Sequence, residues 1–551
     1  MKIKLIIVSM LAALALTACS KDKNGPVDGE FETAYLTIQI APQIPTRASS
    51  ELQGSAAEST IGDLYIVTFD SSRTVIKHTQ ATTPYIHIVT SDLTTNPATN
   101  VSTTNDAFKV SPSVKYVLMV ANPGPKLLER LKTLVVGSTT YAHFNQAIIA
   151  EAGTTGADRA DRIADEIRKS DNTYFAMINA GGIYNATPGA SENSYEDCLV
   201  DVSANIVLVS ATTDDATAQQ NAKDNRAELT IERLAAKVEV SVGDAVKLAG
   251  NYSGVTGAAT SPDGHGLFLF QGWEFDHRNS MFFPYALKNT TADTHASGVY
   301  ANNFYTVDPN YLLAGNAYTD GIIKNDLDGR KPNFTWNEEN GYDYAIENTM
   351  AADAQKHGGT TILVIQAQYA PMSNWTLGED WFSYGTAVYQ NLAAVQTAYN
   401  TATPGSGLIT ACDNFFTQVS AALTAIGGIA IPANFAALDQ TTHLDPITDG
   451  GEICKIEDCL LWYDGGLNYY YSAIRHDRAS EDDMYFGKYG IVRNNWYKLN
   501  LTSVAGKGTP WYPGGGPGDP KPDEDDDEGT ARLAFEITVG PWVYWTNDFG
   551  I

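Results

Sequence analysis

Short runs in which apolar and polar residues alternate recur along the whole chain. The first is 35–40, where Leu36, Ile38 and Ile40 share one face of a predicted strand. Prolines follow shortly afterwards, and because proline cannot donate a hydrogen bond to a sheet, we expect the strand to end there. The alternation predicts that one face of this strand is buried.

Similar patterns predict many further elements. Strands are expected at 64–69, 114–120, 174–177, 229–242, 266–270, 361–369, 467–474 and 496–504, and helical patterns occur at 126–134, 157–168, 387–399 and 415–425. Many short strands with long insertions favour a mainly β protein made of β-sandwich domains with helical insertions. We place a domain boundary near residue 243, after the run 229–242.

The first residues have the pattern of a secretory signal. Two lysines precede a mostly apolar run from Leu5 to Leu16, which is too short for a permanent membrane span. Small residues then lead to Cys19, as in a bacterial lipobox. We expect residues 1–18 to be removed and Cys19 to carry acyl chains that hold the precursor on a membrane. An ordinary signal peptide followed by an accidental cysteine is the alternative.

The charge balance is strongly acidic. The 551 residues include 36 Lys and Arg against 64 Asp and Glu, for a net charge of −28, and a chain that begins at Ala48 would carry −29. Nucleic-acid binding depends on clustered basic residues, so this class of partner is excluded. A strongly negative surface instead keeps a crowded surface protein soluble.

The remaining cysteines are Cys198, Cys412, Cys454 and Cys459. Export would permit disulfides, and Cys454 and Cys459 are close enough in sequence to pair across a turn. Free buried thiols are an equally open alternative. No His-Cys or Cys-x-x-Cys spacing indicates a zinc site, and no metal or cofactor is expected.

The end of the chain combines an unusual linker with a strand. Residues 510–528 are rich in glycine, proline and acidic residues, a composition that we expect to stay extended. A strand then follows in which every second residue is apolar: Leu533, Phe535, Ile537 and Val539. Trp542 lies shortly after this alternation. Two readings remain open: the strand folds back on its own domain, or it serves another molecule.

Several motifs, in the same order, resemble those of the fimbrillins of Bacteroidales, and most closely the major subunit of the short fimbriae of Porphyromonas. They are the lipobox at Cys19, the strand YLTIQI followed by Arg47, the strands 116–122 and 231–240, the segment IVRNNWYKLNLTSV (491–504), the Pro/Asp-rich linker and the ending Val-Gly-Pro-Trp at 539–542. The match extends from the lipobox to the terminus, and the VRNN segment with the PW ending is its most specific part.

The resemblance implies two transthyretin-like β-sandwich domains and a maturation step. In that family a trypsin-like, Arg-specific protease cuts in the loop after the first strand, and Arg47-Ala48 matches that position. The implied division is 1–18 signal peptide, 19–47 lipidated propeptide with the first strand, 48–243 and 244–509 sandwich domains, and 510–551 linker and donor strand. A surface arginine without a role is the alternative for Arg47.

Cleavage would leave an open groove that accepts a strand from the C-terminus of a neighbouring subunit. Such a head-to-tail contact gives an open filament. A chain with both a cleavable arginine and a donor strand fits the repeating stalk, whose partners are other copies, the protease, and anchor and tip subunits. The resemblance places the mature subunit in a fimbrium on the cell surface and the precursor at the outer membrane, and it implies a role in adhesion and biofilm formation.

No constellation of catalytic residues is present, so we expect the chain not to be an enzyme. The histidines are scattered, and the sequence contains no H-E-x-x-H motif or nucleophile elbow. The aromatic runs 462–463 and 469–471 could stack on sugars, although packing within a sheet is the more common use. The alternatives to a stalk subunit are a monomeric, glycan-binding surface lipoprotein or an accessory or tip adhesin; an enzyme acting on polysaccharide has no supporting motif.

Overall fold

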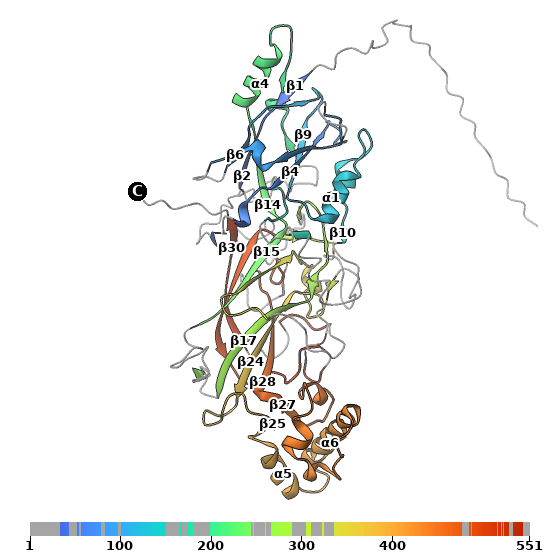
Figure 1. Ribbon diagram of the computed structural model, residues 1–551, viewed down its shortest axis with the longest axis vertical. Coiled ribbons are helices and arrows are strands. Elements are labelled where there is room, and N and C mark those ends of the chain that lie inside the picture. Colours follow the sequence, from blue (N-terminus) through green and yellow to red (C-terminus); the bar gives the residue numbers. More distant parts are fainter. Residues whose placement is uncertain are drawn as a thin grey trace, which may run out of the picture.

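The protein is elongated and mainly β, with two β regions stacked along its long axis and a helical cap at one end (Figure 1). The computed structural model describes residues 33–42, 52–53, 57–78, 83–96, 101–149, 166–167, 174–180, 199–243, 246, 259–260, 266–288, 305–309, 322–323, 336–476, 484–485, 487–514, 516–519, 521, 523–527 and 533–543.

The first β region contains a large mixed sheet. Its strand order is β5 (Ile86–Val89), β4 (Asp63–Phe69), β9 (Tyr116–Ala121), β11 (Met177–Asn179), β14 (Ala227–Arg233), β2 (Ile38–Pro42), β7 (Ser102–Thr104) and β6 (Leu93–Thr95), with β12 (Val200–Asp201) on β9. A smaller sheet has the order β13 (Val207–Leu208), β1 (Ala34–Leu36) and β8 (Phe108–Val110).

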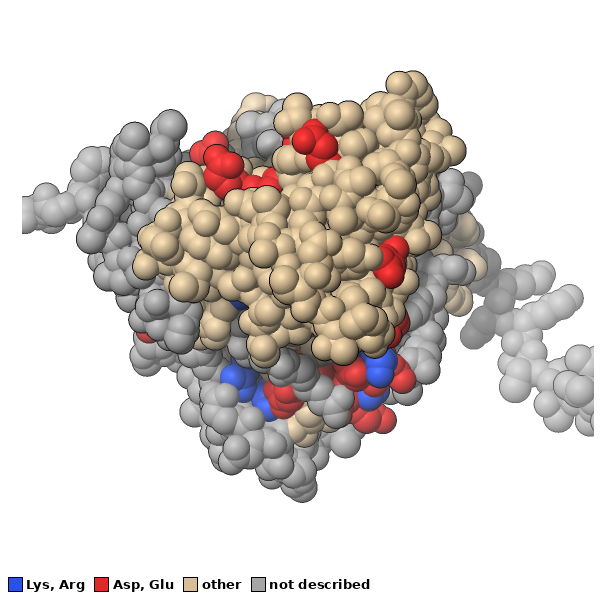
Figure 2. All heavy atoms as spheres, turned by 90° about the horizontal axis from the view of Figure 1, so that it is seen from below, with Lys and Arg blue, Asp and Glu red and all other residues tan. Residues whose placement is uncertain are grey.

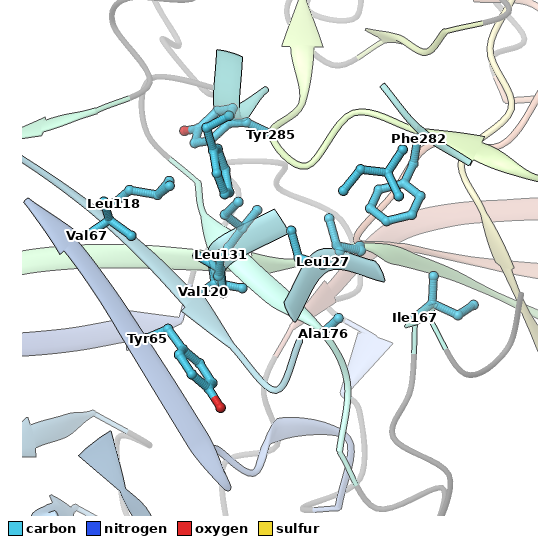
Figure 3. Packing of buried hydrophobic residues seen from close by; sticks show 14 of the residues in the cluster. Tyr65, Val67, Leu118, Val120, Leu127, Leu131, Ile167, Ala176, Phe282 and Tyr285 are labelled. Carbon is cyan, nitrogen blue, oxygen red and sulfur yellow. The ribbon is translucent and has the colours of Figure 1, made fainter. Parts of the chain in front are cut away.

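Both faces of β4 and β9 are buried, because their residues point alternately into two cores. One core contains Leu64, Ile66 and the first strands β1 and β2. The other contains Val67 and Val120 and is covered by helix α1 (Pro125–Lys132) through Leu127 and Leu131 (Figure 3). Helices α2 (Tyr141–Phe144) and α4 (Asp215–Asp224) and the 3₁₀ turns η1 (Ala57–Ser59), η2 (Thr90–Asp92) and η4 (Ser203–Asn205) complete this region.

The predicted strand 229–242 is two strands. β14 ends at Arg233 in the first sheet, and β15 (Ala235–Val242) begins at once in the next sheet, so the chain crosses between the β regions at Leu234. The crossing therefore precedes the boundary expected near residue 243. Burial continues across Leu234 and includes the charged residues Glu232 and Arg233. The apolar alternation changes phase there, from Leu229 and Ile231 to Val238 and Val240, and this change marks the crossing in the sequence.

The second β region has two sheets around one core. One has the order β23 (Tyr342–Ile346), β15, β29 (Asn495–Val504), β30 (Leu533–Val543) and β3 (Leu52–Gln53); the other has β16 (Ala259–Thr260), β17 (Leu267–Asp276), β24 (Ile362–Ala370) and β28 (Leu467–Ala473). Apolar residues from both sheets form one cluster. Short pairs are β10 (Ile148–Ile149) with β19 (Met281–Phe282), β18 (Arg278–Asn279) with β22 (Ile322–Ile323), and β20 (Leu287–Lys288) with β21 (Thr306–Val307).

The helical cap, residues 381–463, lies at the far end of the second β region (Figure 1). It contains the sheet β26 (Ala387–Tyr389), β25 (Trp381–Tyr384) and β27 (Leu461–Tyr463), helices α5 (Leu392–Thr401) and α6 (Gly407–Ile426), the short turns η6 (Phe435–Ala437) and η8 (Glu452–Cys454) and the π-helical turn η7 (Gln440–Leu444). The side chain of Asn391 caps α5. Helix α6 ends at Ile426 and is followed by Gly427, whose φ of 77° favours glycine. A core of its own holds the cap together.

The VRNN segment, residues 492–495, forms buried hydrogen bonds and an ion pair at the junction between the two β regions. Arg493 is buried, pairs with Glu347 and donates to the carbonyl oxygen of Phe283 at 2.8 Å. Asn494, at φ 57°, donates its backbone N–H to Ala235 beside the crossing and accepts hydrogen bonds from Arg233. The most specific sequence motif therefore has a structural role at the crossing.

The Pro/Gly/acidic linker is packed, contrary to the expectation that it stays extended. Trp511 is buried in the core of the cap, and its indole N–H donates to Asp519 at 3.0 Å. Backbone N–H groups of Gly514 and Gly516 donate to the same carboxylate. The prediction of an extended linker is wrong because two aromatic residues, Trp511 and Tyr512, supply the apolar surface that anchors this segment.

Candidate strand-exchange site

The first strand, predicted as one strand at 35–40, is two strands in the structure: β1, in the smaller sheet, and β2, in the interior of the large sheet. β2 lies between β14, with which it pairs in parallel, and β7, with which it pairs antiparallel. Leu36, Ile38 and Ile40 are all buried in one core, as their spacing predicted. Because β2 has a partner on each side, its loss would leave a gap with two unpaired strand edges and an apolar floor.

Local contacts also hold the first strand in place. The backbone N–H of Ile38 donates to the hydroxyl of Thr104 at 3.2 Å, and the hydroxyl of Tyr35 donates to Asp215 on α4 at 2.7 Å. Both contacts link the strand to segments more than 60 residues away. The first strand therefore belongs to the tertiary structure of the first β region.

Cys19, Arg47 and Ala48 lie outside the described residues, so lipidation and cleavage remain predictions. The chain after them returns to the body at η1, where Glu58 is buried and accepts from Lys237 at 2.7 Å and from the hydroxyl of Tyr344 at 2.6 Å. Burial, as the largest effect, lowers the pKa of Lys237. This anchor keeps the chain from residue 58 onward attached if a cut occurs near Arg47.

The C-terminal strand folds back on its own protein in this structure. β30 pairs antiparallel with β29 from Leu533 to Pro541 and places Leu533 against the core of the second β region. Phe535, Ile537 and Val539 pack against the same core but are only half-buried, and the residues between them are exposed. Only the backbone of Trp542 is described, in the same strand.

The end of β30 also touches the segment just after the expected cleavage site. Leu52 and Gln53 of β3 pair in parallel with Trp542 and Val543. The candidate donor and the segment 52–53 therefore form the edge of one sheet. A cut at Arg47 would leave β3 attached to the body on one side only.

An acidic clasp, defined as Asp525, Asp526 and Asp527, holds the base of the tail to the body. Lys356 pairs with Asp525 at 2.8 Å, and the buried Lys488 pairs with Asp527. Asp526 accepts from Thr360 and lies 3.5 Å from His357. Burial raises the pKa of Asp526 to about 7. The clasp therefore holds the chain to the body as far as Asp527.

Cys454 and Cys459 do not form a disulfide in the structure: together with Cys412 they are buried free thiols in the core of the cap. Burial, followed by a hydrogen bond with Cys459, raises the pKa of the Cys454 thiol well above its ordinary value. Thiol–disulfide exchange requires a thiolate, so this apolar environment slows oxidation of the buried pair. Cys198 lies outside the described residues.

Packing accounts for the aromatic runs. Trp462, Tyr463, Tyr469 and Tyr470 are buried, and Tyr463 stacks on Trp381 with ring centroids 3.6 Å apart. None of these four side chains is placed to stack on a soluble sugar. The sequence offered the correct reading through their position on predicted strands.

An open cleft of about 640 Å³ lies where the cap joins the second β region. Its lining includes the half-buried Trp375 and the exposed Glu379, Asn391 and Asp445. Asp380, also in the lining, accepts hydrogen bonds from Gln440, Trp462 and Gly465 at 2.6–2.9 Å, so it has a structural role. Sequence reasoning missed this cleft because its residues come from three separate segments.

Neither a metal site nor a membrane span is found in the described part of the chain. Among these residues, no three His, Cys, Asp or Glu side chains gather in a way that could hold a metal ion. Within the same residues, no helix combines the length and apolarity needed to cross a bilayer.

The C-terminal part of the chain matches a known family model. Residues 462–548 match the family model described as "Major fimbrial subunit protein type IV, Fimbrillin, C-terminal". This range includes β28, β29, the acidic clasp and β30. The matched family consists of structural, non-enzymatic subunits, in agreement with the expectation that the chain is not an enzyme. No curated protein matches the chain.

Solved structures align over most of the chain at low similarity. A protein of Parabacteroides distasonis, provisionally described as a cell adhesion protein, has 10% identity and a TM-score of 0.38, covering 94% of this chain and 99% of its own. A tip fimbrial protein of Porphyromonas gingivalis with a C-terminal truncation has 11% identity and a TM-score of 0.33 (93% and 100% covered). A fimbrilin of Porphyromonas gingivalis has 11% identity and a TM-score of 0.32 (93% and 98% covered).

Proposed function

We propose that the chain is a fimbrillin and forms the repeating stalk of a surface fimbria, with two transthyretin-like β-sandwich domains. Maturation removes the lipidated segment 19–47 by cleavage after Arg47, and the tail of another copy fills the gap. The observation that carries the proposal is the interior position of β2, between β14 and β7. A strand that is interior to the sheet yet joined to a cleavable terminus leaves a specific acceptor behind.

The gap is a strong acceptor on energetic grounds. Leu36, Ile38 and Ile40 are each almost fully buried, and at about 1.5–3 kcal/mol per side chain their loss exposes surface worth roughly 5–9 kcal/mol. Hydrogen bonds to two neighbouring strands, each worth about 0.5–1.5 kcal/mol net, add to this. An incoming strand regains both contributions.

The tail has the properties that a donor needs. Leu533, Phe535, Ile537 and Val539 repeat at the same two-residue spacing as Leu36, Ile38 and Ile40. In its own sheet the tail leaves three of these side chains half-buried, so transfer to a two-sided gap increases their burial. The acidic clasp fixes where the transferable segment begins.

The proposed partners are other copies of the chain, anchor and tip subunits, and a trypsin-like, Arg-specific protease. A precursor carrying acyl chains on Cys19 would be an outer-membrane lipoprotein, and the processed subunit part of the fimbrium. The presence of both an acceptor segment and a donor-like tail favours the stalk over a tip position.

The proposal is tested with the chain expressed without its signal segment. Brief trypsin treatment should produce a species that begins at Ala48 and forms SDS-resistant ladders. Arg47→Ala should stay intact at this position and monomeric. Deletion of residues 533–551 should leave a folded, cleavable subunit that does not polymerise, and normal fibres from this truncation would refute the donor role.

A second candidate function, glycan binding, is favoured by the cleft beside the cap. Trp375 offers a partly exposed aromatic face, with carboxylate and amide groups around it that suit sugar hydroxyls. Trp375→Ala should weaken binding of a soluble oligosaccharide at least 10-fold, whereas Tyr342→Ala, at an exposed aromatic residue outside the cleft, should not. Absence of binding to a broad set of oligosaccharides would exclude this function.

A further inference from the structure

The larger part of the helical cap, residues 381–438, is almost free of charge in a strongly acidic protein. Between Trp381 and Leu438, the single charged residue is Asp413. Figure 2, which views the molecule from the cap end, shows a broad uncharged face with isolated acidic side chains and basic residues only beyond it. Charged residues make up 18% of the whole chain, so residues 381–438 are strongly depleted of charge, whereas the rest of the cap, 439–463, carries acidic residues such as Asp445 and Asp449.

The most apolar part of this face is the tip that follows α6, defined as residues 424–434. Ile426 and Ile431 are each 48% exposed, and Ile429 is partly buried against the core of the cap. The other residues of the tip are small or uncharged, and most are exposed. Surface loops are usually polar, so two exposed isoleucines together on an uncharged tip indicate a contact surface.

We propose that this tip is a homotypic contact: it packs against the same tip of a second copy of the chain. Two copies that each carry a net charge of −28 repel one another wherever their charged surfaces meet. The tip itself carries no charge, so pairing it with the same tip places uncharged surface on both sides of the contact. A symmetric contact also matches each exposed isoleucine with apolar surface of the same kind.

A single contact between two molecules is weak, but many such contacts can form between two fibres. A few isoleucines and small residues bury far less than the roughly 1,000 Å² that a stable interface needs. Subunits repeated along a filament present many tips at once, so the contacts add by avidity. The tip thus provides lateral association, a property separate from growth of the filament by strand exchange.

Cross-linking of uncleaved protein tests the contact without any need for polymerisation. The chain without its first 19 residues carries either Ile431→Cys or, as a matched control in the first β region, Val135→Cys; Val135 is 56% exposed. With a short bismaleimide at equal protein concentration, Ile431→Cys should give covalent dimers at least fivefold faster than Val135→Cys. Equal rates would overturn the proposal.

Two additions identify the nature of the contact. Ile426→Asp, added to Ile431→Cys, should lower the cross-linking rate to that of the control, because it places like charges opposite each other. An increase from 50 to 500 mM NaCl should not slow cross-linking of the tip. A rate that instead falls with salt would show that a charged surface makes the contact and would overturn the homotypic, uncharged interface.

Discussion

The first strand and the last strand have the same alternation of apolar residues and very different surroundings. β2 has partner strands on both sides and buries Ile38 and Ile40 completely or nearly so, whereas β30 has one long partner and leaves Ile537 and Val539 half-buried. The difference teaches that an alternating pattern predicts a strand and its inner face, but not how deeply the sheet buries it.

This contrast also gives the proposed exchange a direction. A strand with the pattern of β30 is bound less well in its own sheet than it would be in the position of β2. In the proposed exchange, removal of the first strand would therefore offer the tail a more buried position than the one it occupies. The following predictions test this difference, from the largest expected effect to the smallest.

Ile38→Ala should lower the free energy of unfolding of the precursor by about 3–4 kcal/mol, because it removes buried methyl groups from the core beneath the sheet. Urea denaturation followed by tryptophan fluorescence and circular dichroism measures this change. A loss below about 1 kcal/mol would mean that β2 does not hold the first β region together.

Stability of the clasp should depend on pH through Asp526, whose pKa of about 7 lies above its value in the unfolded chain. The folded state then binds more protons between about pH 4 and 7, so stability falls as pH rises through this range. Between pH 5 and 8 the loss should be about 2–3 kcal/mol, and Asp526→Asn should abolish it.

His357→Gln is the matched control for this pH dependence, because His357 lies 3.5 Å from Asp526. Asp525 and Asp527, with Lys356 and Lys488, complete the charged groups of the clasp. If His357→Gln removes the dependence and Asp526→Asn leaves it unchanged, the assignment to Asp526 is wrong.

Ile537→Ala should cost the precursor only about 1 kcal/mol, since this side chain is half-buried on β30. In the polymer the same side chain would occupy the gap left by β2, and the cost should rise to about 2–4 kcal/mol. Subunit release from fibres in denaturant measures the second value. Equal costs in precursor and polymer would contradict transfer to a more buried site.

Leu52→Pro should have the smallest effect, below about 1 kcal/mol, because β3 contributes only two residues to the edge of β30. Hydrogen exchange of backbone amides near Val543 should become a few-fold faster, while amides near Ile537 stay protected by β29. Unchanged exchange at Val543 would show that β3 does not restrain the tail.

Much of the fold could be predicted from the sequence, and the misses have physical causes. The strands 64–69, 361–369 and 496–504 and the helix near 126–134 are confirmed, because periodicity and propensity agree there. The crossing at Leu234 was missed because the change of phase in the alternation falls within one run of strand-forming residues. The packing of the linker was missed because two aromatic residues lie within a composition typical of disorder. The pairing partners of β2 and β30 could not be predicted from the sequence, since register between distant segments is not encoded locally.

Strand exchange is tested most directly by mixing two variants, one that can only donate a strand and one that can only accept a strand. Arg47→Ala keeps its first strand and its tail, so it can only donate; a chain that lacks residues 528–551 can be cleaved and can only accept. After protease treatment, native mass spectrometry should find one-to-one heterodimers in the mixture and monomers in either sample alone. Monomers in the mixture, or polymers from either subunit by itself, would contradict the account.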